Sequence, residues 1–128
     1  MIAENDLALG RMVEAISTSR YWKDSVVFVL EDDAQDGPDH VDAHRTVGLV
    51  ISPWVRRGVV DSTMYTTASF VRTMELILGL PPMNQIDATA TPLSDCFTEK
   101  PDFAPYVALP TNVPLDQMNP EPKKISDA

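Results

Sequence analysis

The chain has 128 residues, with 19 acidic and 10 basic side chains and a formal net charge of −9. That length fits one domain or part of one, and 44% hydrophobic with 23% charged residues excludes wholesale disorder. The negative balance argues against binding to nucleic acid, whose phosphates require clustered lysine and arginine, and against docking on an anionic membrane. The single cysteine excludes an internal disulfide and a zinc site built from cysteines.

The sequence predicts neither a membrane span nor a signal peptide. No apolar run approaches the roughly 20 residues needed to cross a bilayer. The first residues, Met-Ile-Ala-Glu-Asn-Asp, lack the basic and apolar regions of a signal peptide. We therefore expect no membrane-spanning segment and no signal peptide in this chain.

Proline is unevenly distributed, since nine of the 11 prolines lie at or after Pro81. Proline lacks the N–H that helices and sheet ladders use. The sequence therefore predicts an α/β segment over residues 1–80 and a Pro-rich, extended tail over residues 81–128.

Four elements are predicted before Pro81. A helix over 6–18, with Asn5 or Asp6 as N-cap, has four apolar residues at helical spacing: Leu9, Met12, Val13 and Ile16. Apolar strands follow at 26–30 and at 47–52, the second stopped by Pro53. A second helix begins after Thr66 and Thr67 and ends at Gly79; its apolar face comprises Phe70, Val71, Met74, Ile77 and Leu78.

Two strands that are apolar on both faces need neighbours and covering layers, and a two-stranded sheet alone is marginal in water. The missing strands could come from the tail, from another chain, or from a larger α/β sheet of which this chain is one part. We favour the larger sheet. Sheet edges left uncovered would also allow self-association.

The segment that joins the two predicted strands carries six carboxylates and both histidines within residues 31–44. Like charges at this density repel one another unless a cation lies among them, and open α/β sheets bind ligands at such strand ends. Carboxylates with imidazole suit a divalent transition metal such as Zn, Mn or Fe, whereas carboxylates alone suit Mg or Ca. The alternative is a solvated turn, which aspartate, glycine and proline favour.

Familiar motifs fit this segment poorly. An EF-hand loop counted from Asp32 requires glutamate at its twelfth position, where Ala43 stands. His40 and His44 have the spacing of a zinc metalloprotease helix, but Val41 replaces the glutamate that should follow the first histidine. The chain also lacks a Gly-rich phosphate loop and the Gly-x-Ser-x-Gly motif that presents a nucleophilic serine.

Five blocks of sequence, in order over residues 5–83, resemble the C-terminal part of the phosphoesterase family of the alkaline phosphatase superfamily. That family includes non-specific phospholipases C and related acid phosphatases. The blocks are Tyr-Trp-Lys-Asp-Ser-Val-Val-Phe-Val (21–29), Glu-Asp-Asp (31–33) through Asp-Gly (36–37) to Asp-His-Val (39–41), Val-Ile-Ser-Pro-Trp-Val-Arg-Arg-Gly (50–58), Ser-Phe-Val-Arg-Thr-Met-Glu (69–75) and Gly-Leu-Pro-Pro (79–82). The resemblance implies part of a doubly wound sheet of the alkaline phosphatase-like type.

The resemblance also implies roles for individual residues. Asp32 and Asp33 match the family's metal-binding pair at a strand end, and His44 resembles the histidine that supplies a second metal position. Asp39 and His40 match the family's Asp-His-Val segment, which would support the metal ligands or face the phosphate. These residues define the predicted metal and phosphate site.

Some parts of the family pattern are absent. Relatives often carry histidine at the position of Ser62, and Asp-His at the positions of Thr66 and Thr67. The family's nucleophile, a serine or threonine, and its first metal-binding acid lie well upstream, and no residue before Asp32 matches them. We therefore expect no catalytic nucleophile in this chain.

The predicted function is metal-dependent hydrolysis of phosphate esters, by a larger enzyme whose C-terminal segment this chain would be. The divalent ion (Zn, Mn, Fe or Ca) would activate the nucleophile and neutralise charge on the phosphate. Arg45, the cation nearest the acidic segment, would contact the phosphate or pair with a neighbouring aspartate. The alternative is a non-catalytic metal-binding or interaction module. Relatives are often exported, and we assign no location.

Overall fold

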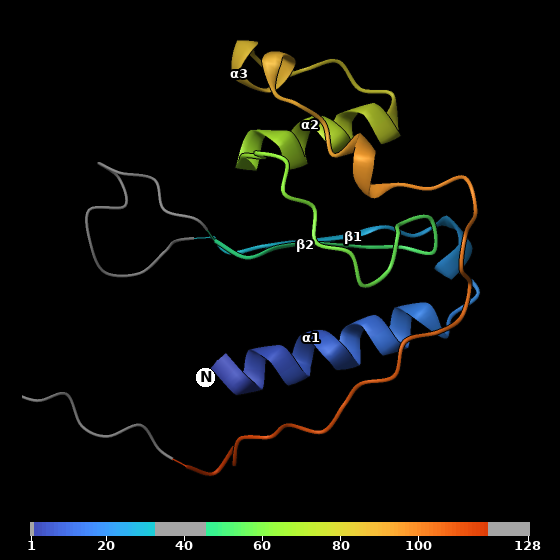
Figure 1. The fold of residues 1–128 in the computed structure, drawn as a ribbon, viewed down its shortest axis with the longest axis vertical. Coiled ribbons are helices and arrows are strands. Elements are labelled where there is room, and N and C mark those ends of the chain that lie inside the picture. The colour runs from blue at the N-terminus through green and yellow to red at the C-terminus, as the bar shows by residue number, and fades with distance from the viewer. Residues whose placement is uncertain (1, 33–45, 118–128) are drawn as a thin grey trace, which may run out of the picture. The chain divides into compact units, whose positions relative to one another are not determined.

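The computed structural model describes residues 2–32 and 46–117. The chain divides into two compact units, one of Met1–Ser19 with Pro105–Ala128 and the other of Arg20–Ala104. Helix α1 belongs to the first unit, and the remaining elements belong to the second (Figure 1). In chain order the elements are α1 (Ile2–Ser17), the 3-10 turn η1 (Trp22–Asp24), β1 (Val27–Leu30), β2 (Gly48–Ile51), α2 (Thr67–Leu78), α3 (Gln85–Thr89) and the 3-10 turn η2 (Ser94–Cys96).

The first unit is built on α1 and the chain that follows residue 104. The hydroxyl of Ser17, which is buried, donates to the Glu14 carbonyl (3.1 Å) and accepts the Tyr106 N–H (2.9 Å). The sequence predicted this helix over 6–18, with Asn5 or Asp6 as its cap. The helix instead begins at Ile2, so both residues lie inside it and neither caps it.

The second unit contains a small antiparallel sheet. Strands β1 and β2 pair in a register that runs from Val27 opposite Ile51 to Leu30 opposite Gly48. Both predicted strands are present, each slightly shorter than expected. The chain leaves β2 at Ser52, whose hydroxyl donates to the Ser25 carbonyl (2.8 Å). This bond ties the chain after β2 to the chain before β1.

Helix α2 covers one face of this sheet (Figure 1). Its Phe70 is 7% exposed and meets the Phe28 ring edge-on, with 6.0 Å between the ring centroids. Gly48 makes this approach possible, because a Cβ at that position would lie 2.8 Å from Cζ of Phe70. The remainder of the predicted apolar face is more open, with Ile77 50% and Leu78 68% exposed. The two-stranded sheet covers only the first part of the helix.

The ends of α2 are where the sequence predicted them. At the N-terminus the Ser69 hydroxyl accepts the N–H of Thr66, the N-cap residue (3.1 Å). At the C-terminus Gly79 takes the left-handed conformation, with φ of 68°, and the Leu80 N–H donates to the Glu75 carbonyl (2.8 Å). This is the usual way for a glycine to close a helix.

Residues 94–104 lie against the chain that follows β2. Val55 and Phe97 form an isolated antiparallel bridge. Arg57 forms an ion pair with Asp102 (3.2 Å). The backbone hydrogen bonds run from Arg56 to Cys96 (3.0 Å), from Thr98 to Trp54 (2.8 Å) and from Asp102 to Pro53 (2.9 Å). We call residues 94–104 the strap.

Helix α3 and turn η2 fall in the region that the sequence predicted to be an extended tail. Proline is absent between Pro82 and Pro92, and this interval contains its own helix start: the Asn84 side chain accepts the Ile86 N–H (2.7 Å). The boundary predicted between residues 80 and 81 stays a prediction. In the described residues the chain combines helices with a two-stranded antiparallel sheet, which is consistent with an α/β fold.

Candidate functional site

The predicted metal site begins at the end of β1. Glu31, the next residue, donates its N–H to the Val47 carbonyl (3.4 Å), and its carboxylate accepts a hydrogen bond from the Thr46 hydroxyl. Asp32 follows and is exposed. The antiparallel pairing of β1 with β2 therefore brings the chain before residue 33 next to the chain after residue 45.

The other residues of the predicted site, Asp33, Asp39, His40, His44 and Arg45, lie outside the described residues. Their assignment as metal ligands or phosphate contacts stays a prediction. Within residues 2–32 and 46–117, no three or more side chains of His, Cys, Asp or Glu are grouped so that they could hold a metal ion. Of the residues predicted to bind the metal, the described part of the chain thus contains Asp32.

The first turn of α2 lies near the same end of the sheet. Phe70 packs over Gly48, and Gly48 pairs with Leu30 at the end of β1. Thr66 and Thr67, the two positions at which the family resemblance implies Asp-His, lie at this helix start, where Thr66 is the N-cap.

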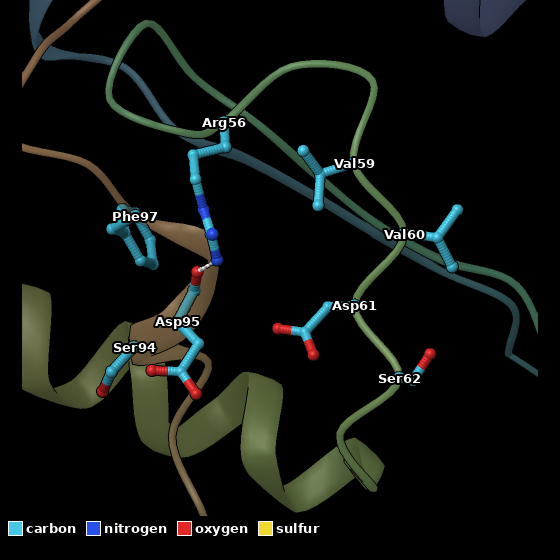
Figure 2. Close-up of a pocket in the computed structure, with 8 residues that line it drawn as sticks. All are labelled: Arg56, Val59, Val60, Asp61, Ser62, Ser94, Asp95 and Phe97. Carbon is cyan, nitrogen blue, oxygen red and sulfur yellow. Dashed lines mark hydrogen bonds between the residues drawn. The ribbon is translucent and has the colours of Figure 1, made fainter.

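A second candidate region is an open pocket of about 750 Å³ between the chain after β2 and the strap. Figure 2 shows Asp61 and Asp95 on opposite walls, with Arg56 above them. The Arg56 guanidinium donates to the Asp95 carbonyl. The lining residues are Arg56, Val59, Val60, Asp61, Ser62, Ser94, Asp95 and Phe97.

Asp61 is the best supported polar group of this pocket. It accepts hydrogen bonds from the Thr63 N–H (2.9 Å), the Tyr65 hydroxyl (3.3 Å) and the Cys96 thiol (3.8 Å). The Thr63 N–H is the largest of the influences that hold the pKa of Asp61 below its usual 3.8. Burial first, and then the Asp61 charge, raise the pKa of Cys96 above 9.0. At neutral pH the pocket is therefore lined by the Asp61 carboxylate, while the neighbouring Cys96 stays protonated and is not an activated nucleophile.

Sequence reasoning did not find this cluster. Asp61 and Cys96 are separated by 35 positions, and the turn that brings them together lies in the region predicted to be extended. The one local signal was the Asp-Ser-Thr run at residues 61–63, in which an aspartate accepts the N–H of the residue two positions later, as turn aspartates do.

The fold and this strand-end segment define a mixed α/β protein that carries an acidic segment between paired strands. The chain belongs to the phosphoesterase family, whose sequence model matches residues 1–81. That membership indicates hydrolysis of phosphate esters. Neither the curated proteins nor the solved structures contain a significant match to the chain. No helix among the described residues is both long and apolar enough to cross a membrane.

Proposed function

We propose that the chain is the C-terminal segment of a larger, metal-dependent phosphoesterase of the alkaline phosphatase-like type, in which another segment supplies the nucleophile. The observation that carries this proposal is the family match over residues 1–81 together with the acidic strand end at Glu31 and Asp32. Finer labels, such as phospholipase C or acid phosphatase, would follow from the substrate of the complete enzyme.

The strand pairing supports the proposed ligand set. Because Glu31 and Thr46 are hydrogen-bonded, Asp33 and His44 are each within two residues of positions that are held together. Carboxylate and imidazole ligands fit Zn, Mn or Fe, and a carboxylate-rich set would also accept Ca. When bound, the ion would lower the pKa of the nucleophile and neutralise charge on the phosphoryl oxygens.

The remaining proposed roles belong to this chain's own side chains. Asp39 and His40 would orient the ligands or the phosphate, and Arg45 would stabilise the charge of the phosphate group. The packing of α2 on the sheet would fix the strand end against which these groups assemble. The small sheet, which among the described residues has two strands, would join the strands of the remaining domain.

Metal binding tests the first part of the proposal. Calorimetric titration of the 128-residue chain with Zn²⁺ or Mn²⁺ should show binding that is lost in Asp33→Ala and in His44→Ala. Asp24→Ala, an exposed aspartate outside the segment, is the matched control and should bind as the parent does. Absence of binding to the parent chain would instead support the solvated turn.

Turnover tests the second part. The purified chain with added metal should not hydrolyse p-nitrophenyl phosphate, because no residue here matches the family's nucleophile. Robust turnover that Asp33→Ala abolishes would show that the nucleophile lies within this chain. Metal binding without turnover, in a chain whose natural gene encodes no upstream strand ending in an acid, would favour the non-catalytic metal-binding module.

A further inference from the structure

Two acidic side chains are buried where α2 meets α3. Glu75 is 5% exposed and Asp87 3% exposed. Both accept a hydrogen bond from the same backbone N–H, that of Met83, at 3.2 Å from Glu75 Oε1 and 2.7 Å from Asp87 Oδ2. The other Asp87 oxygen accepts the Asn84 N–H (2.9 Å). A single pair of carboxyl groups therefore holds the connection between the two helices.

The charge around this pair is poorly balanced. Among the described residues, the cation that forms an ion pair with this cluster is Arg72 of α2, which lies 3.2 Å from Glu75. The connection of residues 79–84 has no titratable side chain, and neither does the stretch 91–93 that returns to α2. Asp87 is thus held mainly by backbone N–H groups, those of Met83 and Asn84.

Helix α3 depends on Asp87. It has five residues, which is far too short for a helix to be stable alone in water. Its start is a reciprocal cap, in which the Asn84 side chain accepts the Ile86 N–H and the Asp87 carboxylate accepts the Asn84 N–H. The same carboxylate accepts the N–H of Met83 in the connection that follows α2. One charge therefore both caps α3 and fixes that connection.

We propose that this cluster is an acid-sensitive latch: protonation of Asp87 releases α3 and the connection of residues 79–84 from α2, while β1 and β2 remain paired. A protonated carboxyl is a much weaker acceptor for the two N–H groups than a carboxylate. The sheet does not depend on this charge, because it is held by its own ladder and by the contact of Phe70 with Phe28.

The direction of the pH dependence follows from the groups around Asp87. Burial alone would raise the pKa of this carboxyl, but a hydrogen bond with the Glu75 side chain and the N–H groups of Met83 and Asn84 together hold the pKa below its usual 3.8. A carboxyl whose pKa is lowered by folding stabilises the folded state above its unfolded pKa. The latch is therefore closed above pH 3.8 and opens as the pH falls below that value, through the pKa of folded Asp87.

Amide hydrogen exchange of the full chain, followed residue by residue by NMR, tests this inference. Exchange is compared at neutral pH and in a series that falls well below pH 3.8, past the titration of folded Asp87, after correction for the intrinsic rates. The amides of Met83, Asn84 and Ala88 should lose protection in acid, whereas those of β1 and β2 should keep it. In Asp87→Asn the protection at residues 83 and 84 should be weak at both pH values. Asp95→Asn, an exposed aspartate of the strap, should respond as the parent does.

The parent chain alone decides the outcome, so a failure of Asp87→Asn to fold does not obstruct the test. Retained protection of Met83 and Asn84 in acid would overturn the latch. Loss of protection in the strands at the same pH would also overturn it, because the transition would then be global unfolding. This latch does not depend on the proposed phosphoesterase activity.

Discussion

A glycine in β2 allows a side chain of α2 to lie against the sheet. Gly48 leaves room for the Phe70 ring, whose Cζ lies 2.8 Å from the place where a Cβ would stand. Gly48 itself is exposed, but a Cβ this close to the buried Phe70 ring would force the ring out of its place. The ring of Phe28 beside Phe70 limits that movement.

We expect Gly48→Ala to lower the free energy of unfolding by about 1 kcal/mol, as measured by urea denaturation. In a double-mutant cycle, Gly48→Ala should lower the free energy of unfolding much less in a Phe70→Leu background than in the parent, because leucine is shorter than phenylalanine and leaves room for the added methyl group. Gly10→Ala is the control, because a Cβ there would lie at an ordinary 3.6 Å from Ala108 and alanine favours helix. Equal losses in Gly48→Ala and Gly10→Ala would contradict the steric explanation.

The buried hydroxyl of Thr73 ties α2 to the chain at Leu93. Thr73 is 4% exposed, donates to the Ser69 carbonyl (2.7 Å) and accepts the N–H of Leu93 (2.9 Å). Thr73→Val keeps the shape but leaves the buried Leu93 N–H without an acceptor, so we expect a loss of about 1–3 kcal/mol in urea denaturation. The exposed Thr67→Val should stay within about 0.5 kcal/mol of the parent.

At the scale of elements, Gly79 ends α2 in the left-handed conformation, which is unfavourable for a residue with a side chain. Gly79→Ala should lower stability by about 1 kcal/mol, because a Cβ disfavours a φ of 68°. Gly79→Asn should lose less, since asparagine tolerates this conformation better. Thermal denaturation followed by circular dichroism checks the order of the three proteins. A larger loss for asparagine than for alanine would exclude the backbone explanation.

The sequence was most informative where an element is defined by its own residues. Thr66 and Gly79 mark the ends of α2, and Pro53 marks the end of β2, because caps and proline act through local geometry. Helix α3 was missed because its start, at Asn84 and Asp87, is a short local signal within a Pro-rich region. The antiparallel direction of β1 and β2 could not be predicted from the sequence, since it depends on contacts between distant segments.

The candidate site was predictable to a similar, limited extent. The position of Asp32 after an apolar strand followed from the pattern of the sequence, and the structure places it at the end of β1. Its proposed partners Asp33 and His44 stay predictions. The cluster of Asp61 with Cys96 could not be predicted, because chain connectivity alone does not reveal that the strap lies against the residues after β2.

At the scale of the whole molecule, the described sheet has two strands and both outer edges lack a partner strand among the described residues. We expect concentration-dependent self-association in sedimentation velocity experiments. Leu49→Lys, at a 40% exposed position of β2, should weaken association. Val60→Lys, at a 91% exposed position outside the strands, changes the net charge equally and should leave association unchanged. A monomer at every concentration would show that the edges are protected.

The family model ends at residue 81, whereas the carbonyls of Pro53 and Trp54 find their donors at Asp102 and Thr98. The hydrogen bonding of the second unit therefore extends beyond the residues that the family model matches. An expression clone trimmed to residues 1–81 would lose the donors to these carbonyls and the strap residues that bind Arg56 and Arg57. Anyone who wishes to graft or recombine this module should carry it at least as far as Ala104.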